Sequence, residues 1–295
     1  DRITEDLEYT QGYDLRGGGD YLGEGSSLYR DITSYLQLNY NNQFGDHTVG
    51  ATAVGEIFRS NSNNISASGE GLDFYELDEL NQLRKIDKRM IGGSSSVSKR
   101  VGFVGRVNYG YKSKYLAEVS ARYDGYDRFS GMHSNQWGLF PALSLAWRIS
   151  EENFIKDNTS IVDDLKLRVG IGKTGNASSV SDYTYLTSLI AHSAPAVILG
   201  GKENYGYYTG SIPNYDLSWE KHMQYSIGLD VVLWRGRLRA EIDVYYKYIY
   251  DIIDAMGGEE PSSVGGYFPG LGNINKQDFR GFEVSLTHEN KVGDL

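Results

Sequence analysis

The sequence predicts an all-β fold: about nine long antiparallel strands that form a segment of a transmembrane β-barrel. Three observations predict it, namely strands near ten residues long, connections that alternate between short and long, and aromatic residues near strand ends. Trp137 and Trp147 stand ten residues apart and share one face, because side chains alternate along a strand. Ten tilted residues rise about 25 Å, the height of the apolar band of an outer-membrane barrel.

The composition fits such a barrel and argues against other classes. Mean hydropathy is -0.45, and no run approaches the about 20 consecutive apolar residues of a membrane-spanning helix. A net charge of -10 argues against nucleic-acid binding, which needs clustered lysine and arginine. The absence of cysteine excludes disulfides, thiol nucleophiles and cysteine-ligated zinc.

The chain does not open on a targeting segment. Residues 1–12 lack the basic region and apolar run of a signal peptide, which an outer-membrane protein needs. The sequence therefore favours an internal or C-terminal piece of a longer protein. Residues 1–30 are interpreted as an extracellular loop segment, and residues 31–295 as part of the transmembrane barrel.

Strands are predicted from period-two alternation of apolar and polar residues. The expected strands are 31–42, 46–59, 99–111, 115–124, 136–148, 164–174, 219–233, 238–249 and 278–290. All of them exceed the about five or six residues that are usual in soluble proteins. Their apolar sides are expected to face lipid, while polar residues such as Glu241 and Asp243 are expected to face the lumen.

The lengths of the connections predict which strand ends face the periplasm and which face the outside of the cell. Short ones are predicted at 43–46, 112–114 and 234–237, and extracellular loops at about 60–98, 125–135, 175–218 and 250–277. Short periplasmic turns and long extracellular loops are typical of outer-membrane barrels.

Two helical pieces are expected within the connections. Apolar residues at helical spacing predict a helix over 72–90. In the moderate connection 149–163, Ser150 and the pair Glu151-Glu152 predict a helix start, with Ser150 as its cap.

Aromatic residues at both strand ends predict two membrane-interface belts. Their predicted members are Trp137, Trp147, Trp219, Trp234, Tyr109, Tyr111, Tyr115 and Tyr123. Trp147 stands beside the moderate connection and Trp137 beside a long loop. The Trp137 end is therefore predicted to be extracellular and the Trp147 end periplasmic.

The most distinctive residues are three stretches in series: VGRVNYGYKSKYLAEVSARYDGYDRFS at 104–130, WGLFPALSLAWRISEENFI at 137–155 and LKLRVGIGKTGN at 165–176. With an earlier hairpin at 39–56, Trp219-Glu220 and RGFEVSL at 280–286, the series resembles the SusC/RagA family over roughly residues 31–290. These are TonB-dependent outer-membrane transporters of Bacteroidetes-type bacteria. Tyr126 and Ala142 depart from the family's usual small residue and serine, which are conservative changes in a barrel wall.

The resemblance implies a barrel of about 22 strands with an N-terminal plug domain that lies outside this chain. It implies nutrient uptake of oligosaccharides or peptides through the outer membrane of a Gram-negative bacterium. The implied partners are a SusD-like surface lipoprotein, TonB acting through the plug, outer-membrane lipid and the substrate.

No residue set suggests catalysis, so the chain is not expected to be an enzyme. The five histidines are scattered and show no metal-ligand spacing. Gly172-Lys173-Thr174 lacks the upstream glycine of a phosphate-binding loop. We expect no catalytic residue, no metal and no cofactor.

Two groups are candidates for substrate binding. Aromatic faces beside polar groups suit sugar rings or peptide side chains, and acidic residues suit calcium or sugar hydroxyls. The candidates are Tyr205, Tyr207, Tyr208 and Tyr215 in one loop, and Asp124, Asp127 and Arg128 in another. The competing explanations are that the rings pack the loop against its neighbours and that an Asp–Arg network stabilises the other loop.

Two other classes of function stay open. An outer-membrane enzyme or adhesin would use the same barrel, and an enzyme would need a nucleophile, base and acid that converge at the loops. A soluble β-sandwich binding domain would also show alternation, because a half-buried sheet is apolar on one side only.

Overall fold

The computed structural model of the chain describes residues 2–14, 21–71, 79–84, 91–132, 135–192, 195, 197–210, 212–256 and 270–290. Its long strands are β1 (Arg2–Asp14), β2 (Tyr21–Phe44), β3 (His47–Glu70), β4 (Ile91–Tyr111), β5 (Tyr115–Tyr126), β6 (Trp137–Arg148), β7 (Val162–Asn176), β12 (Glu220–Leu233), β13 (Leu238–Ala255) and β14 (Leu271–His288). Short strands are β8 (Leu189–Ala191), β9 (Val197–Leu199), β10 (Lys202–Asn204) and β11 (Tyr207–Thr209). Short helices are η1 (Leu80–Gln82), η3 (Ile149–Glu151) and α1 (Asn153–Lys156).

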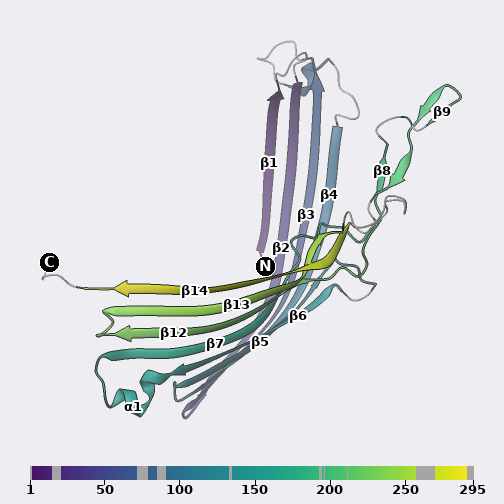
Figure 1. Cartoon of the computed structure of the whole chain (residues 1–295). Coiled ribbons are helices and arrows are strands. Elements are labelled where there is room, and N and C mark those ends of the chain that lie inside the picture. The colour runs from purple at the N-terminus through teal and green to yellow at the C-terminus, as the bar shows by residue number, and fades with distance from the viewer. Residues whose placement is uncertain are drawn as a thin grey trace. The chain divides into compact units, whose positions relative to one another are not determined.

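The ten long strands form one sheet, in the order β1-β2-β3-β4-β5-β6-β7-β12-β13-β14 (Figure 1). Neighbours in the sheet are consecutive in the chain, except that the loop with β8–β11 lies between β7 and β12. The all-β prediction is confirmed. In the described part of the chain, the helices are too short or too polar for any of them to cross a membrane.

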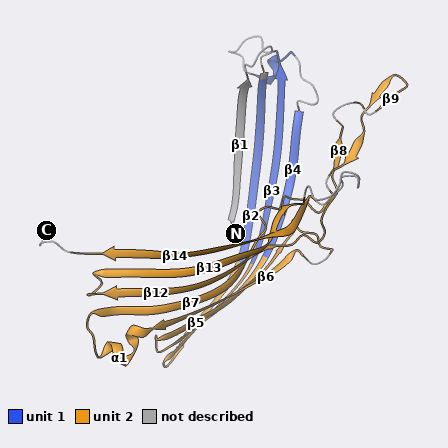
Figure 2. Cartoon of the chain, in the orientation of Figure 1, with its two compact units in different colours: residues 1–35, 56–101 blue, residues 36–55, 102–295 orange. Residues whose placement is uncertain are grey.

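The chain divides into two compact units (Figure 2). Unit 1 contains residues 1–35 and 56–101, and unit 2 contains residues 36–55 and 102–295. Unit 1 has a small core in which Leu22 and Leu83 are buried and Leu80 packs against them. Unit 2 contains β5–β7 and β12–β14, and the features described below belong to it unless stated otherwise.

All nine predicted strands are present, and β1 is a tenth. The prediction that residues 1–30 form a loop is wrong for 2–14 and 21–30, because β1 pairs with β2 from Arg2 opposite Thr33 to Asp14 opposite Tyr21. Strands β3 and β4 likewise continue into the predicted loop 60–98. The extensions of β3 and β4 consist mostly of serine, asparagine and glycine, so they form a backbone ladder without the apolar alternation that signals a strand. In the sequence of β1, Glu5 and Gln11 interrupt the alternation.

The predicted helix at 72–90 is largely outside the described residues. Only 79–84 of it is described, and Leu80–Gln82 there forms the 3-10 helix η1. The predicted loop 250–277 is shorter than expected, because β13 continues to Ala255 and β14 begins at Leu271. The predicted loop 175–218 is present and carries four short strands, β8 to β11.

The connection between β6 and β7 contains η3 and α1, as its sequence predicts, but Ser150 does not cap a helix. Its hydroxyl instead donates to Asp164 Oδ1 on β7 at 2.9 Å. Ser150 is the second residue of η3, while the residues before η3 and α1 are Arg148 and Glu152, so it does not stand at a capping position.

One face of the sheet is apolar across six strands. Registered neighbours on β5, β6, β7, β12, β13 and β14 form a single row of Ala117, Leu145, Val169, Ile227, Val244 and Phe282. The five larger side chains of this row are exposed, up to 76% for Phe282. An exposed apolar area of this extent indicates that this face contacts lipid rather than water.

The opposite face carries small and polar side chains. The adjacent row across the same six strands is Glu118, Ser144, Gly170, Ser226, Tyr245 and Gly281. A one-residue shift in register would exchange the two rows, so the pairing fixes which face meets lipid.

Candidate functional site

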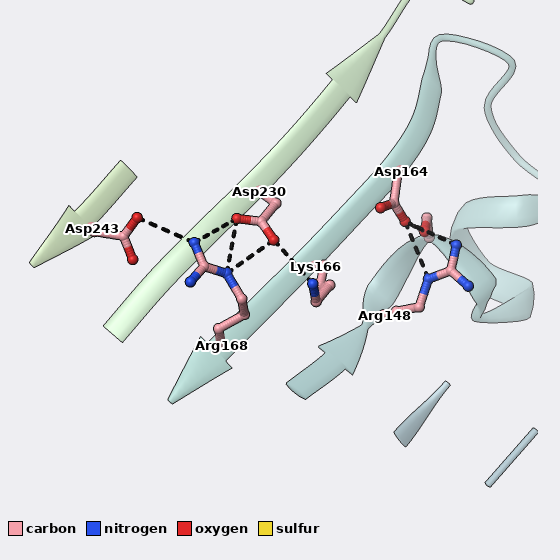
Figure 3. Close-up of polar contacts among 7 residues, drawn as sticks. Arg148, Asp164, Lys166, Arg168, Asp230 and Asp243 are labelled. Carbon is pink, nitrogen blue, oxygen red and sulfur yellow. Dashed lines mark hydrogen bonds and ion pairs between the residues drawn. The ribbon is translucent and has the colours of Figure 1, made fainter. Parts of the chain in front are cut away.

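The polar face carries a charged network that joins three strands. Arg168 on β7 donates from Nε to both carboxylate oxygens of Asp230 on β12 at 2.9 Å, and from Nη2 to Asp230 Oδ1 at 2.7 Å. The same Nη2 donates to Asp243 on β13 at 3.1 Å. Lys166 Nζ lies 3.2 Å from Asp230 Oδ2 (Figure 3). Two cations and two anions thus form a fixed, balanced group on the polar face.

Gly228 makes this network possible. It lies between Arg168 and Asp243 in the sheet register, on β12. A Cβ built at residue 228 would overlap the Asp243 carboxylate and lie 2.8 Å from the Arg168 Cζ atom. The arginine therefore crosses β12 only because this position has no side chain.

A second charged group lies where β6 ends and β7 begins. Arg148 Nη2 is 3.3 Å from Asp164 Oδ1 (Figure 3). It is 3.8 Å from Glu151 Oε1. Lys156 Nζ is 3.0 Å from Glu151 Oε2, and this bond, with the nearby Arg148 charge, lowers the pKa of the Glu151 carboxyl. This connection is thus held by charge as well as by backbone hydrogen bonds.

Hydrogen bonds to Glu152 join the same connection to β5 and β6. Its carboxylate accepts hydrogen bonds from the Tyr115 hydroxyl at 2.7 Å, Lys114 Nζ at 3.1 Å and Trp147 Nε1 at 3.2 Å. These three donors, Tyr115 foremost, lower the pKa of Glu152. Two of the predicted belt residues are therefore ordered by one carboxylate.

A compact apolar core stands among the connections that were predicted to be extracellular. It consists of Phe129, Phe140, Ala177, Val180, Leu217, Trp219 and Ile253. Trp219 is central: its ring centroid lies 5.3 Å from Phe129 and 5.4 Å from Phe140, and its Nε1 donates to Gln136 O at 3.1 Å. Residues far apart in the sequence thus fold into one preformed unit.

This core corrects one prediction. Trp219 was expected at the membrane interface, but only 6% of it is exposed. The chain reaches β12 at Glu220, so Trp219 precedes the strand and packs inward under the loops. The other predicted belt residues are exposed or half-buried, and Tyr123 stacks on Trp137 with ring centroids 4.8 Å apart. Their role as interface anchors stays a prediction.

Asn273 on β14 anchors the loop that leads to Trp219. Its Oδ1 accepts from Ser218 N–H at 2.8 Å, and its Nδ2 donates to Ser218 O at 2.9 Å and to Asp251 O at 2.8 Å. Asp251 has a φ of 55° and lies at an irregularity in the β13–β14 pairing. One amide thus joins the loop to a bulged strand.

The four tyrosines predicted to bind substrate lie apart in the structure. Tyr205, Tyr207, Tyr208 and Tyr215 are all exposed. Tyr207 and Tyr208 are consecutive on β11 and therefore project to opposite sides of the strand. The Tyr208 ring lies 4.9 Å from His192, and the Tyr205 hydroxyl donates to Glu203. The rings are available to a ligand but do not converge on one.

The second predicted group is divided as well. Asp124 lies buried in β5, where Arg122 Nε donates to it at 2.6 Å. Arg128 Nε instead donates to Asp182 at 2.7 Å and so joins two loops. Among the described residues, neither pair includes Asp127, and no three acidic or histidine residues are placed to hold a metal ion. The contacts match the loop-stabilising Asp–Arg explanation, with Asp182 as the partner that sequence patterns did not identify.

A cavity of about 390 Å³ opens among these loops, against the side of the apolar core. Its volume is within the range of small-ligand sites. Its lining mixes polar and apolar side chains, among them Asp182, Thr184, Ser188, Asn214 and Leu217. The cavity has no signal in the sequence, because its residues come from separated segments that share no pattern.

Residues 2–293 match the family model described as TonB dependent receptor-like, beta-barrel. The chain belongs to this family. It is 38% identical over 245 residues to the TonB-dependent receptor SusC of Bacteroides thetaiotaomicron, which covers 81% of the chain and 23% of that receptor. It is 29% identical over 279 residues to the TonB-dependent receptor P3 of Formosa agariphila, which covers 94% of the chain and 27% of that receptor.

The fold has a close match among solved structures. A chain of the RagAB peptide transporter superposes with a TM-score of 0.78 and 21% identity, over 96% of this chain and 31% of that one. The chain spans about a quarter of the length of the curated relatives it matches. The predicted SusC/RagA resemblance is confirmed, and the family places the chain in the outer membrane of a Gram-negative bacterium.

Proposed function

We propose that the chain forms part of the wall of an importer that takes up oligosaccharides or peptides across the outer membrane. The observation that carries the proposal is the two-faced sheet: an exposed apolar row on one side and the Arg168–Asp230–Asp243 network on the other. A wall between lipid and a water-filled lumen needs these two surfaces.

In this proposal the wall performs no covalent chemistry. Its paired charges keep the lumen face polar and rigid, so that a hydrated substrate passes without binding to an isolated charge. The substrate would first bind among the extracellular loops, where the 390 Å³ cavity and the exposed tyrosines lie. Both cargo classes follow from the SusC/RagA resemblance, and the likeness to a chain of the RagAB peptide transporter adds support for peptide.

Two partners complete the proposal. A SusD-like surface lipoprotein would cover the loops and retain the substrate. TonB would supply energy through a plug domain outside this chain. Support for TonB comes from the family that the chain belongs to, and support for the lipoprotein from its likeness to SusC and to a chain of RagAB.

Uptake in the source bacterium tests the proposal. Deletion of the gene is expected to abolish accumulation of labelled oligosaccharide or labelled peptide, and deletion of TonB to do the same. Restoring the gene should restore uptake. Unchanged uptake of both cargo classes in the deletion strain would contradict an importer and favour an adhesin or an enzyme.

A further inference from the structure

The turn between β12 and β13, residues 234–237, has an unfavourable backbone for its sequence. Trp234 and Arg235 have φ values of 57° and 60°, and Gly236 has a φ of 82°. The left-handed region suits glycine and asparagine, because a larger residue brings its Cβ close to a carbonyl oxygen. Tight hairpins usually place Asn-Gly here. Lys112 and Ser113 in another short turn have similar φ values of 52° and 54°, so the two turns differ in their side chains rather than in their backbone.

Neighbouring segments hold the turn in this shape. Trp234 N–H donates to Ile161 O at 2.9 Å, and Gly236 N–H donates to Asp163 Oδ2 at 2.9 Å. On the other side, Arg237 O accepts from Glu289 N–H at 2.8 Å. The backbone is thus bonded to residues at the start of β7 and just after β14, which fixes the position of each Cα atom in the turn.

The side chains of the turn are unlike those of the other short connections. Trp234 is 50% exposed, and Arg235 and Arg237 are exposed beside it. Within the described residues, neither guanidinium has an acidic partner. In the other connections at this end, Lys112 pairs with Asp46 at 3.6 Å and Lys114 with Glu152 at 3.1 Å.

We propose that residues 234–237 bind the phosphate of an anionic phospholipid in the periplasmic leaflet of the outer membrane. Short turns lie at the periplasmic interface, where a tryptophan ring inserts between headgroups and acyl chains. A guanidinium matches phosphate in two-point geometry and carries a full charge at any physiological pH. The site rests on the membrane location of the chain and is independent of its cargo.

The test uses the complete transporter that contains this chain, in nanodiscs of phosphatidylethanolamine and phosphatidylglycerol. Native mass spectrometry counts the lipids that stay bound after release. The wild type is expected to retain phosphatidylglycerol above its share in the bilayer. The double variant Arg235→Gln/Arg237→Gln should reduce that enrichment about thirtyfold, because two cations near the headgroup are lost.

Two further variants separate lipid binding from folding. Lys112→Gln removes a cation from another short turn, where it is already paired, and should keep the wild-type enrichment. Trp234→Gly relieves the backbone but removes the ring, so thermal stability should stay equal or rise while lipid retention falls. A folded double variant with wild-type enrichment, or an equal loss in Lys112→Gln, overturns the proposal.

Discussion

At the scale of single residues, Gly228 decides whether three strands share one charge network. Arg168 reaches Asp243 only by crossing the position where residue 228 would have a side chain. Period-two alternation predicted that Asp243 faces the lumen. It did not predict the network, since one arginine crossing a glycine depends on cross-strand register, which a single sequence does not show.

Gly228→Ala is therefore expected to separate Arg168 from Asp243 and to destabilise the complete protein by about 1–3 kcal/mol, the usual cost of overpacking. Gly105→Ala on β4 is the matched control, because no atom lies within 4 Å of a Cβ built there. Its effect should stay below about 0.5 kcal/mol. Denaturant unfolding in lipid vesicles measures both, and equal effects would show that the space at residue 228 is unimportant.

A second prediction at this scale concerns the exposed aromatic residues proposed to bind substrate. Tyr207 is 72% exposed in the loop proposed to meet substrate, and Met132 is 72% exposed in another loop. Tyr207→Ala should lower substrate affinity about three- to tenfold, the value of one aromatic stacking contact. Met132→Ala should leave it unchanged. Calorimetric titration with the transported cargo measures both variants, and unchanged affinity in Tyr207→Ala would remove that ring from the site.

At the scale of elements, the strands were predictable and the loop core was not. Strands β5, β6, β7 and β12 begin and end within about two residues of their predicted bounds, because the bilayer imposes alternation along their whole length. Strand β1 lacks a clear signal, because Glu5 and Gln11 interrupt its alternation. Trp219 was assigned to the interface because its position beside a strand was visible, whereas its contacts with Phe129 and Phe140 come from residues about 80 or more positions away.

Substitution of Asn273 tests whether its hydrogen bonds stabilise the loop that leads to Trp219. Asn273→Ala removes three hydrogen bonds to Ser218 and Asp251 and should destabilise the loop locally by about 1–3 kcal/mol. Hydrogen exchange of residues 214–219 should accelerate accordingly. Asn275→Ala, which removes one exposed hydrogen bond to Asp254, is the control and should change exchange little. If the exchange rates of these residues are unchanged in Asn273→Ala, the apolar core alone keeps this loop ordered.

The connection between β6 and β7 should respond to acid through Glu152. Its pKa is lowered by hydrogen bonds from Tyr115, Lys114 and Trp147, so the folded state favours the ionised form. The stabilisation is complete above the usual carboxyl pKa of 4.5 and is lost as pH falls through the lowered value. Glu152→Gln should lower stability at neutral pH and flatten the acid limb of the stability curve. If the variant loses stability at low pH as the wild type does, other carboxylates cause that loss.

At the scale of the whole molecule, the sheet register separates a lipid face from a lumen face. Adjacent residues Val284 and Ser285 on β14 lie on opposite faces: Val284 is opposite Ile242 and Ser285 opposite Glu241. Val284→Lys should cost about 2–4 kcal/mol, since the ammonium must enter the middle of the bilayer. Ser285→Lys should cost little, because the lysine meets water and the Glu241 carboxylate. Unfolding titrations of the complete protein in vesicles measure the free energy of unfolding of both variants. A larger loss in Ser285→Lys than in Val284→Lys would show that the two faces are assigned the wrong way round.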